Sequence, residues 1–269
     1  MNFQTFFLDN ELIIRLVAFF GIFGLVAMTE LIIPKRTLRI NKMKRWFNNI
    51  GLIVFNSLIL RFIIPFTGVM VALLCQEKGF GVFNLITVPS WIAILSCIIL
   101  LDLLIYTQHV VFHLVPIFWR LHKVHHSDLD YDLTMASRFH PIEMGLSLCL
   151  RCFFIALLGV PVIAVILFEV ILNGAAMFNH GNFLLPKKLD NVLRLFIVTP
   201  DMHFVHHSIE KNEYNRNFGF NLPWWDRIFG TYKAEPKLGQ QEMEIGLKDY
   251  PIERSVVSLG RMVMLPFEK

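Results

Sequence analysis

The segment WIAILSCIILLDLLIYTQHVVFHLV, residues 91–115, holds two features that decide the fold of this chain. It is apolar from Trp91 to Tyr106 except for Asp102, and its apolar character continues to Val115. A helix of about 20 residues is needed to cross the hydrocarbon core of a bilayer. The segment also carries two histidines at the spacing His-x-x-x-His near its end. It therefore predicts a membrane helix with candidate metal ligands on one face of one end.

The composition of the whole chain favours a membrane location. Of the 269 residues, 55% are hydrophobic and 17% are charged, whereas soluble domains contain about 25% charged residues. The mean hydropathy is +0.56. A soluble core cannot absorb so much apolar surface at this chain length, and the same values exclude intrinsic disorder. The expected class is an integral membrane protein.

Three further apolar stretches are expected to lie in the membrane. Leu12–Ile33 and Ile50–Cys75 each fit one crossing. Gly145–Phe178 is too long for one crossing and short for two, and Gly159-Val160-Pro161 in its middle suggests a tight helical hairpin. We predict an all-α, polytopic membrane protein with about four to five membrane helices. Residues 1–269 are expected to form a single integral membrane domain.

Positive charge is concentrated just after the first stretch, at Lys35, Arg36, Arg39, Lys42, Lys44 and Arg45. Loops rich in Lys and Arg remain in the cytoplasm. The number of crossings then places every histidine cluster, and the C-terminus at Lys269, on the same side. We therefore expect a histidine-rich cap on the cytoplasmic face of the membrane.

A short segment after the hairpin has an amphipathic pattern. Apolar residues recur at i, i+3, i+4 and i+7, namely Leu189, Val192, Leu193 and Phe196. Together with the neighbouring Lys and Arg, the pattern fits a helix lying on the membrane surface. It fits equally well an ordinary amphipathic helix of a small cytoplasmic cap.

The ten histidines all lie between residues 109 and 207. Eight of them form one HxxxH and two HxxHH clusters: His109 and His113; His122, His125 and His126; His203, His206 and His207. His140 and His180 are single. Residues three and four apart share a helix face, with Cβ atoms about 5–6 Å apart, so HxxHH can serve two adjacent metals. Imidazole suits zinc, iron, copper and nickel, so the ligand type leaves the metal open.

These clusters, set around hydrophobic spans, resemble the fatty acid hydroxylase / sterol desaturase superfamily of membrane di-iron enzymes. The resemblance extends over residues 90–235 and includes Asp102–His113, Phe118–His122, Arg138–Glu143, Asn217–Gly219 and Trp225–Thr231. One departure is Val110, where many members have Arg after the first histidine. This change should leave ligation intact.

The resemblance implies two Fe²⁺ ions held almost wholly by histidine, with O2 as co-substrate. The implied metal-binding and catalytic residues are His109, His113, His122, His125, His126, His180, His203, His206 and His207. His140 is expected beside these ligands rather than among them. Asp102, Glu143 and Asp201 are candidates to hold imidazole N–H groups, because a ligating histidine usually donates its second nitrogen to such a partner.

The same resemblance implies an O2-dependent oxidoreductase that hydroxylates or desaturates a fatty acyl chain, a sterol or a related lipid, with residues 90–235 as the catalytic region. The sequence contains no glycine-rich dinucleotide motif and no His-Pro-Gly-Gly haem motif. Electrons must therefore come from a separate redox protein or reductase, and no nucleic acid partner is expected. The basic patches Lys42–Arg45 and Lys187–Lys188 could dock that donor or, more simply, anionic lipid.

Two other functions remain open at the level of sequence. With zinc, the site would suit a membrane lipid hydrolase that uses metal-bound water, although so many histidines per metal leave few open positions. A membrane metal carrier or sensor would use the same ligands. Transport sites usually lie near the midplane, whereas the histidines here are expected at one membrane face, which argues against a carrier. The only support for these two alternatives is the charge within the spans at Glu30, Arg61 and Asp102.

Overall fold

The computed structural model describes residues 3–250 and 257–268, so the predicted position of Lys269 lies outside the described residues. Within these ranges the chain forms helices and no strands. Two isolated bridges, Pro34 to Phe183 and Ser208 to Ile245, join loops. The predicted all-α fold is confirmed.

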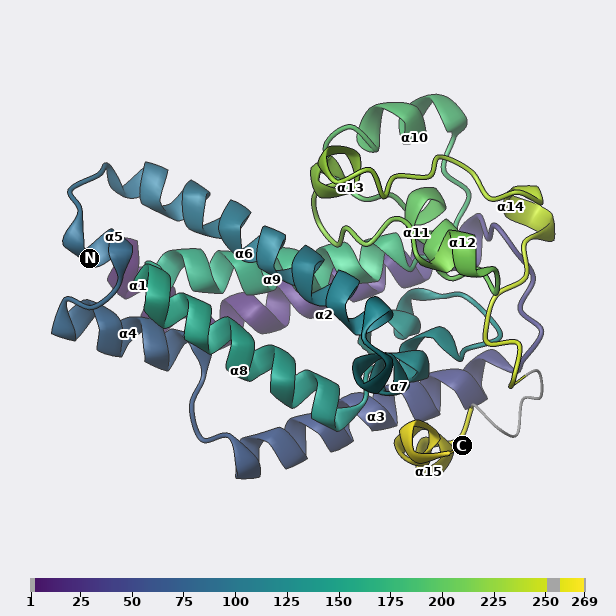
Figure 1. Cartoon of the computed structure of the whole chain (residues 1–269), viewed down its shortest axis with the longest axis horizontal. Coiled ribbons are helices and arrows are strands. Elements are labelled where there is room, and N and C mark those ends of the chain that lie inside the picture. Colours follow the sequence, from purple (N-terminus) through teal and green to yellow (C-terminus); the bar gives the residue numbers. More distant parts are fainter. Residues whose placement is uncertain (1–2, 251–256, 269) are drawn as a thin grey trace.

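Long helices lying side by side form the body of the molecule (Figure 1). They are α2 (Glu11–Ile32), α3 (Lys42–Ile63), α6 (Ser90–Leu114), α8 (Pro141–Leu158) and α9 (Val162–Asn179). Five segments of the described chain are long and apolar enough to cross a membrane. One of these segments, Lys42–Leu85, contains α3 and the two short helices that follow it. Their outward side chains are apolar; Phe62, for example, is 85% exposed. The chain is an integral membrane protein.

The second predicted span is not one continuous helix. It is divided into α3 and α4 (Gly68–Lys78), with α5 (Val82–Leu85) beyond them. Pro65 explains the break, because the residue before a proline is disfavoured in the helical region, and Ile64 is extended. The Thr67 side chain then accepts a hydrogen bond from Met70 N and caps the start of α4.

The hairpin suggested by Gly159-Val160-Pro161 joins α8 to α9. Gly159 ends α8 with φ of 66°, and a Cβ atom there would lie 2.8 Å from Asn84 Nδ2. Only glycine meets both conditions without strain. Helices α4 and α6 each pack against both arms of the hairpin, and the main apolar core lies between these four helices.

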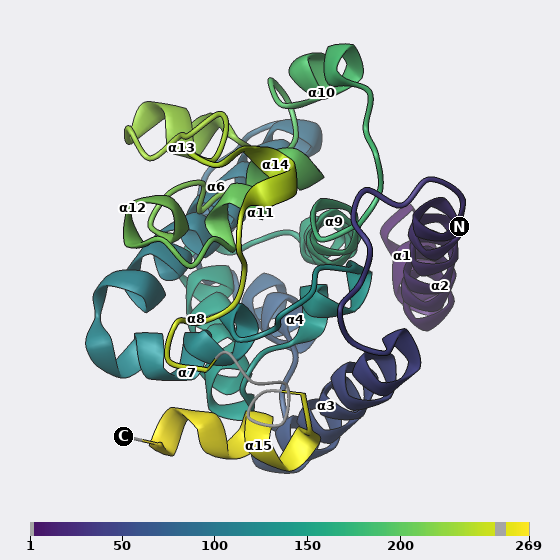
Figure 2. The ribbon, with the colours of Figure 1, turned by 90° about the vertical axis from the view of Figure 1, so that its right-hand side faces the viewer.

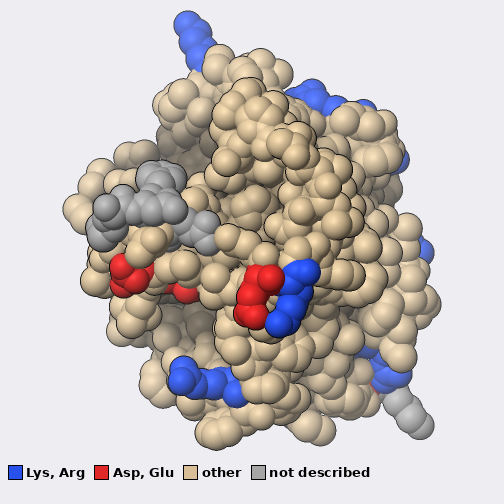
Figure 3. Space-filling model, turned by 90° about the vertical axis from the view of Figure 1, so that its left-hand side faces the viewer, with Lys and Arg blue, Asp and Glu red and all other residues tan. Residues whose placement is uncertain are grey.

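Short helices form a cap at the end of the bundle that carries the histidines (Figures 1 and 2). They are α7 (Pro116–His126), η1 (Leu133–Ser137), α10 (Lys187–Leu193), α11 (Pro200–His206), α12 (Lys211–Tyr214), α13 (Trp224–Ile228), α14 (Gly239–Glu242), α15 (Leu259–Met264) and η3 (Leu265–Phe267). The short α1 (Phe3–Asp9) lies at the opposite end. Few charged side chains are visible on that opposite end (Figure 3).

The basic segment from Lys35 to Arg45, which runs from the loop after α2 into the start of α3, holds the cap to the bundle. The Arg45 guanidinium is fully buried and donates to both carboxylate oxygens of Asp128, at 3.0 and 2.9 Å, and also to Asp132. Lys35 pairs with Asp201. Arg45 therefore cannot belong to a surface patch that docks an electron donor, because its charge is taken up by carboxylates inside the protein.

The amphipathic segment forms α10 and the turn after it. Its apolar side chains Leu189, Val192 and Phe196 are all exposed, as are Ile228 and Phe229 at and just beyond the end of α13. An ordinary cap helix would bury this face against the protein. The exposure favours a helix on the membrane surface.

Candidate metal centre

The nine histidines that the sequence singles out as ligands meet in two groups. Within each group, one nitrogen from every ring lies within 4.8 Å of the others: His109, His113, His122, His126 and His206 in the first group; His125, His180, His203 and His207 in the second. All nine side chains are buried.

The five-histidine group joins three helices. His109 and His113 lie one turn apart on α6, and Pro116 begins α7 directly afterwards, so the chain folds back over the end of α6. The Nε2 atoms of His109 and His122 are 3.1 Å apart. Among the described residues, Nε2 of His113, His126 and His206 is buried without a hydrogen-bond partner.

The four-histidine group joins α7, the end of α9 and α11. His180 Nε2 lies 3.2 Å from His125 Nε2 and 3.1 Å from His203 Nε2. His207 Nε2 lies 3.3 Å from His203 Nε2. Helix α11 is placed by the Thr199 side chain at its N-cap and by a proline at its first turn, as the sequence suggests.

Each HxxHH motif contributes to both groups. In α7, His122 and His126 face the five-histidine group and His125 faces the other. In the second motif, His206 joins the five-histidine group while His203 and His207 join the other. The two groups are therefore neighbours that share the same two short segments.

The chemical state of these rings fits a pair of metal ions. Burial lowers the pKa of His122 to about 3 and that of His180 to about 4. The rings are therefore neutral at physiological pH, which is the form that binds metal. Convergent, buried nitrogens without partners are unfavourable unless something coordinates them. The residues present thus fit two metal ions, one in each group.

Several of the histidine rings are held in place by a hydrogen bond through Nδ1, the ring nitrogen that does not face the histidine group. His122 Nδ1 lies 2.6 Å from Glu143 Oε1, and His113 Nδ1 lies 3.3 Å from Asn215 Oδ1. In three other rings, Nδ1 lies within hydrogen-bonding distance of a backbone carbonyl oxygen: Phe218 O for His109, Ala176 O for His180 and Arg216 O for His206. Such bonds fix the tautomer so that Nε2 faces the metal.

Comparison with known proteins agrees with this geometry. A family model described as fatty acid hydroxylase matches residues 94–231, about half of the chain. This chain belongs to the fatty acid hydroxylase family. No solved structure gives a significant match.

Three curated relatives of this family member illustrate the similarity. Ornithine lipid hydroxylase OlsE of Rhizobium tropici is 28% identical over 52% of this chain and 42% of its own length. Alkylglycerol monooxygenase of Caenorhabditis elegans is 29% identical over 54% of this chain and 27% of its own. Cholesterol 25-hydroxylase of Homo sapiens is 28% identical over 52% of this chain and 51% of its own length. The matched region therefore spans about half of these relatives or less.

Two of the three carboxylates expected to hold imidazoles have other partners in this family member. Glu143 does hold His122. Asp102 instead accepts from Trp225 Nε1 at 2.8 Å and from Leu222 N. Asp201 pairs with Lys35. The expectation for Asp102 and Asp201 was wrong, because tertiary packing places other donors beside them.

The sequence motifs around Asn217 and Asp226 had no assigned role, and the structure supplies one. Asp226 accepts hydrogen bonds from the backbone N–H groups of Phe218 and Gly219, both at 2.8 Å. Asn217, with φ of 52°, bonds to two backbone carbonyls. These contacts hold the loop whose Phe218 carbonyl lies 2.7 Å from His109 Nδ1. The motif match was the only sequence signal for these positioning residues.

His140 lies outside both groups. Its Nδ1 accepts a hydrogen bond from Ile142 N at the start of α8, and its Nε2 lies 3.2 Å from Val263 O. It therefore positions the helix that carries Glu143, which agrees with a place beside the ligands.

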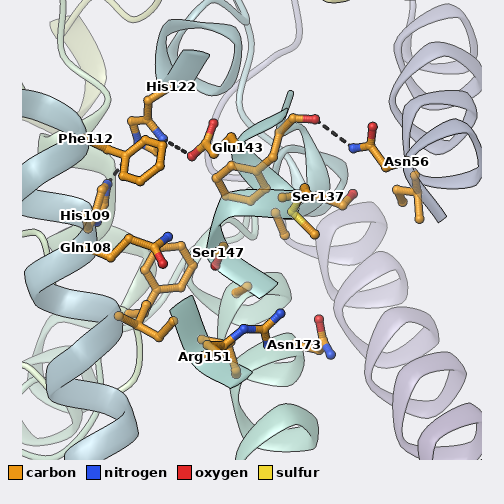
Figure 4. Close-up of a pocket in the computed structure, with 18 of the residues that line it drawn as sticks. Asn56, Gln108, His109, Phe112, His122, Ser137, Glu143, Ser147, Arg151 and Asn173 are labelled. Carbon is orange, nitrogen blue, oxygen red and sulfur yellow. Dashed lines mark hydrogen bonds and ion pairs between the residues drawn. The ribbon is translucent and has the colours of Figure 1, made fainter. Parts of the chain in front are cut away.

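A cavity of about 320 Å³ runs from the five-histidine group into the helix bundle. His109, His122 and Glu143 line one end (Figure 4). Ser57 on α3 and Asn173 on α9 also line it and are exposed. The cavity therefore opens between membrane helices, on a surface that faces lipid.

Proposed function

We propose that this protein is a membrane-bound di-iron oxygenase that uses O2 to oxidise a lipid, and that the nine buried histidines are the iron ligands. The observation that carries this proposal is a cavity that is open to the bilayer at one side and ends at His109 and His122. A lipid chain can enter it without passing through water. Residues 90–235 would form the catalytic region.

The names of the relatives support insertion of oxygen rather than desaturation. OlsE is named a lipid hydroxylase, and the other two are named a monooxygenase and a hydroxylase. Hydroxylation consumes one O2, two electrons and two protons for each C–H bond converted to C–OH, with release of water. The choice among fatty acyl, sterol and related lipids depends on the shape of the cavity.

Iron bound by the two histidine groups would supply the reductive activation of O2. The protein's own contribution is position and exclusion of water. Glu143 holds the His122 ring in the tautomer that directs Nε2 inward. Phe112, Phe139 and Phe220 line the cavity next to the histidines, and their rings keep water from the reacting carbon while the walls orient the chain.

The proposed orientation has the histidine cap in the cytoplasm. The Lys- and Arg-rich loop lies on the cap side of the bundle, and the opposite end has few charges (Figure 3). This asymmetry satisfies the positive-inside rule. Electrons would then come from a cytoplasmic redox protein or reductase, which binds at the cap.

The test is reconstitution of the purified, iron-loaded protein in liposomes with a chemical reductant. We expect a lipid product that carries one oxygen atom from labelled O2, formed only when both O2 and reductant are present. Conversion that proceeds equally under argon would contradict the oxygenase and favour the zinc hydrolase. The matched control is His125→Ala protein, which should give no product.

A further inference from the structure

The cavity also carries polar side chains along the part of its wall that lies among the membrane helices. Gln108 on α6, Ser147 and Arg151 on α8, and Asn173 on α9 all line it (Figure 4). Polar and charged side chains within the bilayer are unfavourable and usually mark a binding site or a pathway. Packing alone does not require them here, because the rest of the cavity wall is mainly apolar.

Two of these side chains have unused hydrogen-bonding capacity. Among the described residues, Arg151 Nε and Gln108 Oε1 are buried and have no hydrogen-bond partner. The first is a donor and the second is an acceptor. A buried polar group without a hydrogen-bond partner is unfavourable. A ligand that both accepts and donates would relieve both.

The ionic contacts nearby leave Arg151 available to a ligand. Glu169 is engaged by Arg15, whose Nη2 lies 2.6 Å from Glu169 Oε2. Arg15 also bonds Glu11 at 2.8 Å. Arg151 Nη1 forms a long ion pair with Glu169 Oε1 at 3.6 Å, which is beyond hydrogen-bonding distance. The Nε–H group of Arg151 therefore remains able to donate a hydrogen bond to a ligand.

The charge of this group decides between two ligand classes. Arg15 and Arg151 carry two positive charges, and Glu11 and Glu169 carry two negative charges, so the group is balanced. A carboxylate placed beside Glu169 would add an uncompensated negative charge in a medium of low dielectric constant. A hydroxyl group adds no charge and supplies both an acceptor and a donor.

Arg151 lies at a defined distance from the metal end of the cavity. Glu143, which holds His122, and Arg151 are both on α8, and at a rise of 1.5 Å per residue they are about 12 Å apart along the helix. A cavity of about 320 Å³ is at the small end of ligand pockets, which range over about 300–1,000 Å³. It therefore holds one hydrocarbon segment rather than a whole two-chain lipid.

We propose that Arg151 and Gln108 bind an uncharged hydroxyl group of the lipid substrate, and so select a hydroxyl-bearing lipid and set which carbon reaches the metals. The inference rests on the proposed function, because it assumes that the cavity receives the lipid that is oxidised. Arg151 and Gln108 are specificity-determining residues in this scheme, and neither belongs to the two histidine groups.

The test is binding of three probes of equal chain length to the purified full-length protein: 1-hexadecanol, hexadecane and hexadecanoate. Each is delivered from cyclodextrin, and affinity is read from the rise in unfolding temperature. We expect the alcohol to bind about tenfold more tightly than the other two, the effect of one hydrogen bond to a charged group. In Arg151→Met the preference should disappear while hexadecane still binds. The control variant Arg61→Met, which replaces an exposed arginine in another span, should keep the preference for the alcohol.

Gln108→Leu provides a second variant that leaves the ion pairs intact, and it should also reduce the preference for the alcohol. Equal binding of all three probes to the wild-type protein would overturn the inference, as would tighter binding of hexadecanoate. So would a preference for the alcohol that survives in both variants. Lipid oxidation together with equal probe binding would overturn this inference alone, whereas a protein that binds the alcohol but holds no iron would overturn the proposed function.

Discussion

Glu143 Oε1 lies 2.6 Å from His122 Nδ1, and both side chains are buried at the metal end of the cavity. The carboxylate comes from α8 and the imidazole from α7. Helix α8 lines the cavity, and His122 is a candidate iron ligand. The contact therefore links the position of this helix to the orientation of the imidazole.

Replacement of Glu143 by Gln should weaken iron binding by about 10–100-fold, because the ring loses the partner that fixes its tautomer and raises its basicity. Metal analysis after dialysis against a graded series of chelator concentrations would measure this. Asp130→Asn is the matched control, since Asp130 is equally buried but accepts from the backbone of Arg39 and Ile40. Equal iron affinity in wild type and Glu143→Gln would contradict the role of the contact.

His125→Ala and His206→Ala remove one ligand from different groups. Each variant should insert normally, hold about half of the wild-type iron and oxidise no lipid, because metal binding requires the complete ligand set. His140→Asn should keep the full iron content, since Asn can still accept the hydrogen bond from Ile142 N. Iron loss in His140→Asn equal to that in His125→Ala would show that the two groups do not define the site.

The metal-free protein should become less stable as the pH falls below about 6.5. Burial lowers the pKa of His122 to about 3 and of His180 to about 4, and burial with neighbouring imidazoles lowers the pKa of His203. The unfolded chain then binds more protons than the folded one, so each such histidine lowers the free energy of unfolding by up to about 1.4 kcal/mol per pH unit. Unfolding temperatures in detergent between about pH 7 and pH 5 would measure this; a constant value contradicts it.

Cysteines introduced at the two ends of the bundle should label from opposite sides of the membrane. Lys237 is exposed on the cap and Lys78 is exposed at the far end. If the proposed orientation is correct, an impermeant maleimide should label Lys78→Cys on intact cells and Lys237→Cys only after permeabilisation, because the positive-inside rule keeps a basic face in the cytoplasm. The reverse pattern would place the histidines outside.

Arg45→Met should lower the free energy of unfolding by about 3–5 kcal/mol, because Asp128 and Asp132 would be left buried without their partner. Arg45→Lys should recover only part of this, since an ammonium cannot make the paired bonds of a guanidinium. Arg61 lies on the same helix as Arg45 and is exposed. The control variant Arg61→Met should therefore change the free energy of unfolding by no more than about 0.5 kcal/mol. Denaturant titration of helicity in detergent distinguishes these cases.

The sequence by itself determined the membrane character, the approximate spans and eight clustered histidines, because hydropathy and helical spacing are properties of short segments. His180 joined the predicted set only through the family resemblance. It could not divide the histidines between two groups. Successive residues of a helix point about 100° apart, so His125 and His126 must face different directions, but only the packing of α7 against α6, α9 and α11 shows what lies in each direction.

The partners of the carboxylates also depended on tertiary structure. Glu143, Asp102 and Asp201 are equivalent candidates in the sequence, yet only Glu143 meets an imidazole. The cavity, its opening between α3 and α9 and the polar part of its wall are likewise made by residues far apart along the chain. A hydrogen bond or a cavity wall needs groups from different helices to be within a few ångströms of one another, and that proximity is decided by how the helices pack.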